Sequence, residues 1–263
     1  MVSDPALRPV RPAEPARVAL RAFAAAGSLS MDTVLEQNLS KVRERLAAAC
    51  ARAGRGPDEV MLLPVSKTVN PDLIAVAARL GLSVFGESRV QEARSKIPLC
   101  PGHLTWHFIG HLQTNKVREA VRLFEQIHAV DSIRLLEALD RACQDEGKRL
   151  PVYLEVNVSG EPSKFGLRPE DVPPVLAASN RFFSVEVKGL MTIPPFSKEA
   201  EAARPFFRKL REWRDQWRQA TGMPLAELSM GMSHDFEIAA EEGATCVRLG
   251  TILFGARKAV ADG

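Results

Sequence analysis

Cysteine, net charge and long apolar runs are all scarce in this chain of 263 residues, and each scarcity excludes a class of protein. The four cysteines are widely spaced and form no CxxC pair, so no disulfide framework is indicated and we expect a reducing, cytoplasmic compartment. The net charge of +3 argues against a dedicated nucleic-acid binder, whose basic excess is stronger and clustered. The longest apolar runs are well short of a membrane span, so no membrane association is expected.

Residues 1–30 differ in composition from the rest of the chain. Prolines from Pro5 to Pro15 alternate with arginine and alanine. Such a segment cannot offset the entropy of ordering it, which predicts a disordered tail, or upstream sequence before a start at Met31. A secretory signal is disfavoured because Arg21 interrupts a short apolar stretch. The arginines leave a transit peptide as the alternative, although serine is sparse.

From residue 33 onward, helix-like and strand-like segments alternate. A first helix is indicated by apolar residues at helical spacing from Leu35 to Leu46, and Gly54 and Gly56 end it. Strand-like runs follow at 60–66, 82–86, 105–109, 126–130, 151–157, 185–191, 226–229 and 246–249. Helix-like segments separate them at 72–80, 90–97, 115–124, 132–146, 169–179, 198–221 and 234–242.

Continuous apolar strands that alternate with helices imply a parallel sheet covered on its outside. Eight such units predict an α/β protein with a single closed (β/α)8 TIM barrel as one domain over residues 31–263, preceded by an extra N-terminal helix. An open doubly wound sheet is the competing architecture. It is disfavoured because no glycine-rich fingerprint follows the first strand.

The functional groups of a barrel lie at the carboxyl ends of its strands. The residues expected there are polar, small or reactive: Lys67, Gly86-Glu87-Ser88, Gly110-His111, Asn157, Met191-Thr192, Ser229-Met230-Gly231 and Gly250-Thr251. Lys67 is the most informative, because an amine at the end of a buried strand can lose its proton and attack an aldehyde, forming a Schiff base. Taken alone, however, a lysine after an apolar strand is usually a solvated strand end.

The loops after the last two strands have the composition of an anion site. Ser229, Gly231, Gly250 and Thr251 offer hydroxyls and backbone N–H groups that can approach a phosphate closely. Strand eight lies beside strand one in a closed barrel, so we expect this pocket next to Lys67. An amine beside a phosphate pocket indicates pyridoxal 5'-phosphate (PLP), a cofactor with one aldehyde and one phosphate.

Arg248 is expected at the same strand end as this pocket. A guanidinium placed against the pyridine nitrogen of PLP keeps that nitrogen unprotonated and weakens the ring as an electron sink. The residue type therefore argues against demanding carbanion chemistry. Each residue has an ordinary explanation when taken alone, a turn for Gly250-Thr251 and a salt bridge for Arg248, and it is their combination that carries the inference.

Several motifs occur in fixed order between residues 33 and 258. They are VSKT (65–68), FGE (85–87), VQE (90–92), WHFIG (106–110), LQTNK (112–116), VNVSGE (156–161), SK (163–164), GLMTIP (189–194), LSMGMS (228–233), VRLGT (247–251) and FGAR (254–257). This set resembles the pyridoxal phosphate homeostasis protein family, the YggS-like PLP-binding proteins. The resemblance implies a barrel like the N-terminal domain of alanine racemase, in intracellular proteins of vitamin B6 homeostasis that lack an established catalytic activity.

The resemblance also implies roles for individual residues. Lys67 matches the lysine that carries the cofactor. The phosphate-binding segments are matched by Ser229, Gly250 and Thr251, and Arg248 matches the arginine near the pyridine ring. We include Gly231, Met191 and Asn157 among the residues expected to bind PLP, because they stand at the same strand ends.

Two positions depart from the family's pattern. Family members usually have asparagine where this chain has Ser88, and many have proline where it has His111. Serine is shorter than asparagine, which leaves in doubt any hydrogen bond that the asparagine makes toward the site. The sequence does not decide whether Lys116 or Lys164 binds surplus cofactor.

The choice between enzyme and carrier depends on a second base. Alanine racemase takes one of its two bases from a tyrosine in a second, β-rich domain. The single tyrosine here, Tyr153, falls inside the fifth strand, and the chain ends at Gly263 soon after the eighth. We therefore expect no catalytic residue and a monomeric carrier that buffers PLP or delivers it to PLP-dependent apoenzymes. A fold-type III racemase or decarboxylase that uses Lys67 alone is the alternative, and an adaptor whose cofactor is incidental is another.

Two further patterns predict ordinary structure. His103, His107 and His111 are spaced by four residues. A strand and loop do not bring that spacing to one face as a helix would, so no metal site is expected. Ser233 precedes the helix-like segment 234–242 and is interpreted as its N-cap.

Overall fold

The computed structural model describes residues 31–255, so the prediction of a disordered tail over 1–30 lies outside the described residues. Its centre is a sheet of parallel strands: β1 (Met61–Pro64), β2 (Val84–Glu87), β3 (Thr105–Phe108), β4 (Gln126–Val130), β5 (Leu150–Glu155), β6 (Val185–Met191), β7 (Glu227–Met232) and β8 (Cys246–Leu249). The strand order is β1-β8-β7-β6-β5-β4-β3-β2, and a parallel bridge between Val65 and Gly86 brings the two end strands together. The predicted (β/α)8 barrel is confirmed, and every predicted strand overlaps an observed one.

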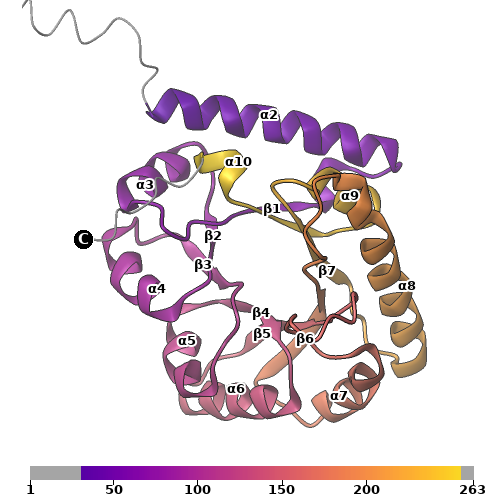
Figure 1. Cartoon of the computed structure of the whole chain (residues 1–263). Helices are drawn as coiled ribbons and strands as arrows, with labels where there is room; N and C mark the ends of the chain where they lie inside the picture. The colour runs from indigo at the N-terminus through magenta and orange to yellow at the C-terminus, as the bar shows by residue number, and fades with distance from the viewer. Residues whose placement is uncertain (1–30, 256–263) are drawn as a thin grey trace, which may run out of the picture.

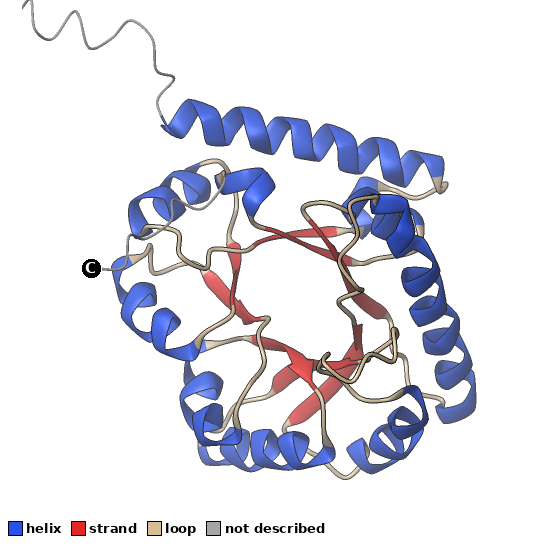
Figure 2. Ribbon diagram, viewed as in Figure 1, coloured by secondary structure: helices blue, strands red, loops and turns tan. Residues whose placement is uncertain are grey.

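Helices surround this ring of strands, as Figures 1 and 2 show. They are α2 (Met31–Arg52), α3 (Pro71–Arg79), α4 (Val90–Lys96), α5 (Val117–Leu123), α6 (Ile133–Asp145), α7 (Val172–Ser179), α8 (Arg204–Thr221), α9 (Phe236–Glu241) and α10 (Thr251–Phe254). Short 3-10 turns lie at 57–59, 97–99, 114–116, 169–171 and 200–203. The expected extra N-terminal helix is α2, which packs outside the ring against α9, α10 and α3. The four-residue helix α10 was not predicted.

The helix boundaries follow local chemistry. Asn70 caps α3 by accepting a hydrogen bond from Asp72 N at 2.9 Å, and Pro71 occupies the first turn, where its missing N–H is not needed. The hydroxyl of Ser132 accepts from Leu135 N at 3.3 Å and caps α6. Gly222 ends α8 with a φ of 70°, a left-handed conformation that glycine adopts without strain.

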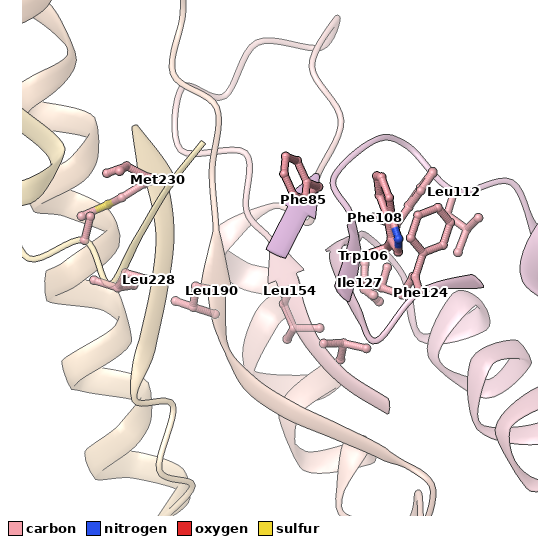
Figure 3. Packing of buried hydrophobic residues seen from close by; sticks show 14 of the residues in the cluster. Phe85, Trp106, Phe108, Leu112, Phe124, Ile127, Leu154, Leu190, Leu228 and Met230 are labelled. Carbon is pink, nitrogen blue, oxygen red and sulfur yellow. The ribbon is translucent and has the colours of Figure 1, made fainter. Parts of the chain in front are cut away.

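The apolar core lies between the strands and the helices, whereas the inside of the barrel is partly polar. Successive side chains of a strand point to opposite faces. Leu228 and Met230 of β7 therefore belong to the outer core, together with Phe85, Trp106 and Phe108 of β2 and β3 (Figure 3). The alternate residue Ser229 faces inward and is fully buried. The inward residues of neighbouring strands can thus form one network.

Candidate functional site

Lys67 lies in the turn that follows β1, at the carboxyl-end edge of the barrel. Both neighbouring strands guide the backbone there: Val65 N donates to Leu249 O of β8 at 2.8 Å, and Ser66 N donates to a carbonyl of β2 at 3.0 Å. Lys67 is half-buried. Thr68 follows with a φ of 64°, which a β-branched residue adopts only when its surroundings hold it there.

The last strand runs beside the first. Leu63 pairs with Arg248 in parallel register. Gly250 follows β8, and a Cβ built on it would lie 3.4 Å from the carbonyl oxygen of Val65. Lys67 comes two residues after Val65, so the amine-bearing turn and the turn after β8 share one edge of the barrel.

Ser233 connects the loops after β7 and β8. Its Oγ accepts hydrogen bonds from Gly250 N and Ile252 N, both at 3.3 Å, in the first turn of α10. The interpretation of Ser233 as the N-cap of the helix that follows it is wrong, because α9 has Asp235 as its N-cap. Ser233 lies two residues too early for that role, and its hydroxyl turns toward the neighbouring loop instead.

Glycine is required at position 231 by the packing of the end of β7 against α9. Its φ is 93°, and an added Cβ would lie 2.5 Å from the Cβ of Ala239 in α9. Real side chains do not approach so closely, so the end of β7 can pass α9 only with glycine at this position. Gly231 thus shapes the end of β7 by leaving space, and Ser233 shapes the loop that follows by accepting hydrogen bonds.

Ser229 lies deeper than the other predicted phosphate residues. Its hydroxyl is fully buried inside the barrel, where it accepts a hydrogen bond from Arg248 Nη1 at 2.7 Å and lies 2.9 Å from His128 Nδ1. The structure therefore places Ser233, rather than Ser229, between the two loops. The contact that the structure assigns to Ser229 is with the arginine, and its contact with the cofactor stays a prediction.

A hydrogen-bonded chain continues from Ser229 through two histidines that were not predicted as a pair. His128 Nε2 lies 3.1 Å from His107 Nδ1, and Arg248 also donates to the backbone oxygen of Thr192 at 2.9 Å. Burial lowers the pKa of His107 to about 4 and holds the pKa of His128 well below its usual value. Both rings are thus neutral near neutral pH, and each offers one N–H and one acceptor.

Glu155 is another residue that the sequence did not single out. It ends β5, is only 6% exposed, and stands two residues after Tyr153, which faces the barrel interior. Burial raises the pKa of Glu155 to about 7, Asp131 adds to this effect, and the positive charge of Arg248 opposes it. A carboxyl group at this edge can therefore gain or lose its proton near neutral pH.

Asn157 and Met191 each have partners of their own in the structure. Asn157 donates to Glu161 O at 2.9 Å and accepts from Gly160 N at 3.0 Å, so its amide orders the loop after β5. Met191 is fully buried and packs inside the barrel with Tyr153 and Ala129. Their role in binding the cofactor stays a prediction.

The two departures from the family's pattern lie in neighbouring loops. His111 Nδ1 is 3.2 Å from a carboxylate oxygen of Asp131, and its ring stacks on Phe165 with centroids 4.1 Å apart. His111 thus joins the loops after β3, β4 and β5. Ser88 has its carbonyl oxygen 2.2 Å from where a Cβ on Gly110 would sit, so the two loops approach as closely as backbone allows.

Residues 31–255 have three further properties that bear on metal binding, membrane association and disulfide formation. In this part of the chain, no group of three or more His, Cys, Asp or Glu side chains is arranged to hold a metal ion. None of the helices described there is both long and apolar enough to cross a membrane. Every cysteine is free, and three of the four are buried.

Known proteins match this chain over most of its length. The family profile described as "Alanine racemase, N-terminal domain" matches residues 37–258. The chain is 46% identical over 223 residues to the pyridoxal phosphate homeostasis protein of Aquifex aeolicus, covering 84% of this chain and 98% of that protein. It is 42% identical to the protein of the same name from Pseudomonas aeruginosa, covering 86% and 97%.

Solved structures agree with these relatives. PipY of Synechococcus elongatus, solved with PLP bound, is 39% identical and superposes with a TM-score of 0.71 over 81% of this chain and all of its own. An alanine racemase of Clostridium difficile superposes with a TM-score of 0.69 at 13% identity over 86% of this chain and 60% of its own, which shows a shared fold alone. The chain belongs to the pyridoxal phosphate homeostasis protein family.

Proposed function

We propose that this protein binds PLP at the carboxyl-end edge of the barrel and acts in vitamin B6 homeostasis, buffering the cofactor or delivering it. The observation that carries the proposal is the pairing of β1 with β8, which puts the Lys67 turn beside the loops joined by Ser233. Relatives named for PLP homeostasis, and a related structure that contains PLP, support the same ligand.

The residue types at this edge fit both ends of PLP. An aldehyde is held covalently by a primary amine, and Lys67 stands at the end of β1. A phosphate is held by N–H and hydroxyl donors, and Ser233, Gly250 and Thr251 carry such groups on the loops after β7 and β8. When bound, PLP supplies the aldehyde for a Schiff base and the ring that other enzymes use as an electron sink.

Arg248 fits a storage role better than a catalytic one. Its guanidinium has donors only, and Ser229 and the backbone of Thr192 hold it inside the barrel. Against a pyridine nitrogen such a group donates a hydrogen bond and leaves the nitrogen without a proton. The ring then stabilises carbanions poorly, which suits a protein that keeps PLP rather than one that uses it.

The position of Tyr153 supports the absence of racemase activity. This residue is 1% exposed, and its hydroxyl donates to a carboxylate oxygen of Glu227, the first residue of β7. The hydroxyl is therefore directed toward the opposite end of the barrel from Lys67. Tyr153 cannot act as the second base on which a racemase of the usual plan depends.

Glu155 favours a second candidate function, a fold-type III racemase or decarboxylase with Lys67 as its amine. Glu155 lies at the same edge of the barrel, and its pKa of about 7 suits a group that takes up or releases a proton near neutral pH. Exchange of the α-hydrogen of amino acids with deuterated water separates the two functions. If the protein exchanges the α-hydrogen faster than free PLP does, and Glu155→Gln abolishes this, the protein is an enzyme and the carrier proposal is wrong.

The binding proposal is tested by trapping the cofactor on the protein. Three proteins are incubated with PLP and reduced with borohydride: wild type, Lys67→Ala and Lys41→Ala. Lys41→Ala is the control, because Lys41 is an exposed lysine of α2. We expect a visible absorbance band that borohydride removes, and a reduced adduct on the peptide that contains Lys67. The band and adduct should persist in Lys41→Ala and fall in Lys67→Ala. An unchanged spectrum in Lys67→Ala would move the anchor elsewhere.

The carrier role includes two finer proposals. We propose that the protein works as a monomer, and that its partners are PLP-dependent apoenzymes. Loaded protein mixed with an apoenzyme should restore that enzyme's activity, and the rate should follow the loss of the protein's absorbance band. Activation no faster than with an equal amount of free PLP would leave buffering as the role. The molar mass of the PLP-loaded protein, measured by light scattering, tests whether it is a monomer.

A further inference from the structure

A buried cluster of charged side chains lies directly behind the Lys67 turn. Lys96 of α4 is 7% exposed, and its Nζ donates to Ser66 O at 2.7 Å, to Glu87 Oε1 at 2.9 Å and to Glu92 Oε1 at 2.5 Å. Glu87 ends β2 and is fully buried. One ammonium group therefore connects the end of β2, the first turn of α4 and the backbone that precedes Lys67.

The same cluster holds the residues on both sides of Lys67. On one side, the hydroxyl of Ser66 donates to Glu87 Oε1 at 2.7 Å. On the other side, Thr68 N donates to Glu92 Oε1 at 2.6 Å. The Thr68 bond matters most, because a φ of 64° is costly for threonine and persists only while something fixes it.

We propose that Lys96, Glu87 and Glu92 are positioning residues that set the direction of the Lys67 amine for covalent capture of PLP. This inference rests on the proposed function. A covalent bond forms quickly only when the two reacting atoms are held near each other in the right orientation. Fixing the backbone immediately before and after Lys67 reduces the directions in which its flexible side chain can leave the turn.

Two features distinguish this cluster from an ordinary stabilising ion pair. Burial raises the pKa of Glu87 although Lys96 opposes the shift, and among the described residues its Oε2 has no hydrogen-bond partner, so part of the carboxylate is desolvated without compensation. Apolar residues often fill such a position at no loss of stability. The unfavourable desolvation of Glu87 therefore occurs next to Lys67, where the hydrogen bonds of the cluster reach the backbone of Ser66 and Thr68.

Glu92→Ala is the most direct test, because the Glu92 side chain is 22% exposed and its loss disturbs the core less than the loss of Lys96. Glu92→Gln keeps an oxygen that can accept from Thr68 N. Arg94→Ala is the matched control: Arg94 lies on the same helix, its side chain is 68% exposed, and it pairs with Glu119. All are compared with wild type by the rate of absorbance change on adding PLP and by hydrogen exchange of the Thr68 amide without ligand. Affinity for pyridoxine 5'-phosphate, which has an alcohol instead of the aldehyde, is measured as well.

We expect Glu92→Ala to slow the covalent step by about ten-fold or more and to speed exchange of the Thr68 amide by a similar factor. Its affinity for pyridoxine 5'-phosphate should stay within about two-fold, because phosphate is bound on the other loops. Glu92→Gln should recover most of the rate, and Arg94→Ala should match wild type.

Two results would overturn the inference. One is a wild-type rate in Glu92→Ala, and the other is an equal fall in the rate and in the affinity for pyridoxine 5'-phosphate, which would indicate general loss of the site. If Glu92→Ala does not fold, Lys96→Met is used for the same comparison between the rate of the covalent step and the affinity for pyridoxine 5'-phosphate. Failure of the proposed function gives a different result: in the wild-type protein, the adduct reduced with borohydride is then not on Lys67.

Discussion

Replacing Gly231 with alanine tests how closely the end of β7 packs against α9. Gly231 has a φ of 93°, where an L-residue is strained by about 1–2 kcal/mol. The added methyl would lie 2.5 Å from Ala239 Cβ, and relieving such an overlap costs about 1–3 kcal/mol. Together the two effects lower the free energy of unfolding by about 2–5 kcal/mol, a large share of the stability of a typical domain.

Gly54→Ala is the matched control, because Gly54 has a φ of 68° and nothing lies within 4 Å of the added methyl. It isolates the backbone strain from the contact with α9. Urea unfolding followed by circular dichroism should show Gly231→Ala to be less stable than Gly54→Ala by at least about 1 kcal/mol. Adding Ala239→Gly to Gly231→Ala should recover part of that difference, since it removes the overlapping methyl. Equal losses of stability in the two single variants would refute the packing argument.

Two pH predictions of opposite sign concern the buried groups near Arg248. The pKa of Glu155 is raised to about 7, so the folded state binds more protons than the unfolded state and stability falls as pH rises from about 4.5 through about 7. Glu155→Gln should remove up to about 3 kcal/mol of this loss. The loss is measured as the difference in the free energy of unfolding in urea between about pH 5 and about pH 8. An unchanged dependence of this free energy on pH would show that Glu155 is not the group that binds the proton. The pKa of His107 is lowered to about 4, so the neutral ring is favoured in the fold and stability is lost as pH falls from about 6.5 through about 4. His107→Gln should reduce this loss of stability at acid pH by up to about 3 kcal/mol. A loss as large as in wild type would show that another group binds the proton.

The barrel could be predicted because its signals are local and repeated. Each strand is a short apolar run, each helix has apolar residues at helical spacing, and turn residues separate them. Closure of the barrel then places the first strand beside the last, which is why Lys67 and Gly250 were expected on one edge although they lie 183 positions apart in the chain. That expectation needed the fold class alone, without any side-chain detail.

The parts that the sequence did not reveal depend on side-chain direction and loop conformation. Ser233 precedes an apolar helix, which is the usual sign of an N-cap, yet its hydroxyl binds the N–H groups of a different helix, 17 and 19 residues away. His107 and His128 meet only because both face inward on adjacent strands, and alternation along β3 was the available signal. Lys96 resembles any lysine in the last turn of a helix, and only the tertiary structure shows that it is buried against Ser66.

The inside of the barrel gives Arg248 an uncommon electrostatic setting, and this bears on how the site treats a ligand. Within residues 31–255, Arg248 donates hydrogen bonds to neutral groups, the hydroxyl of Ser229 and the backbone oxygen of Thr192, and the ring beyond Ser229 is a neutral histidine. Neutral partners fix the guanidinium without cancelling its charge, so its field extends toward the open edge. Glu155 and Asp235 are nearby acids that oppose this field, and because the pKa of Glu155 is about 7 its share of the opposition varies with pH around neutrality. A site of this kind attracts an anionic ligand more strongly as Glu155 gains its proton, so the retention of PLP should tighten as pH falls from about 8 to about 6.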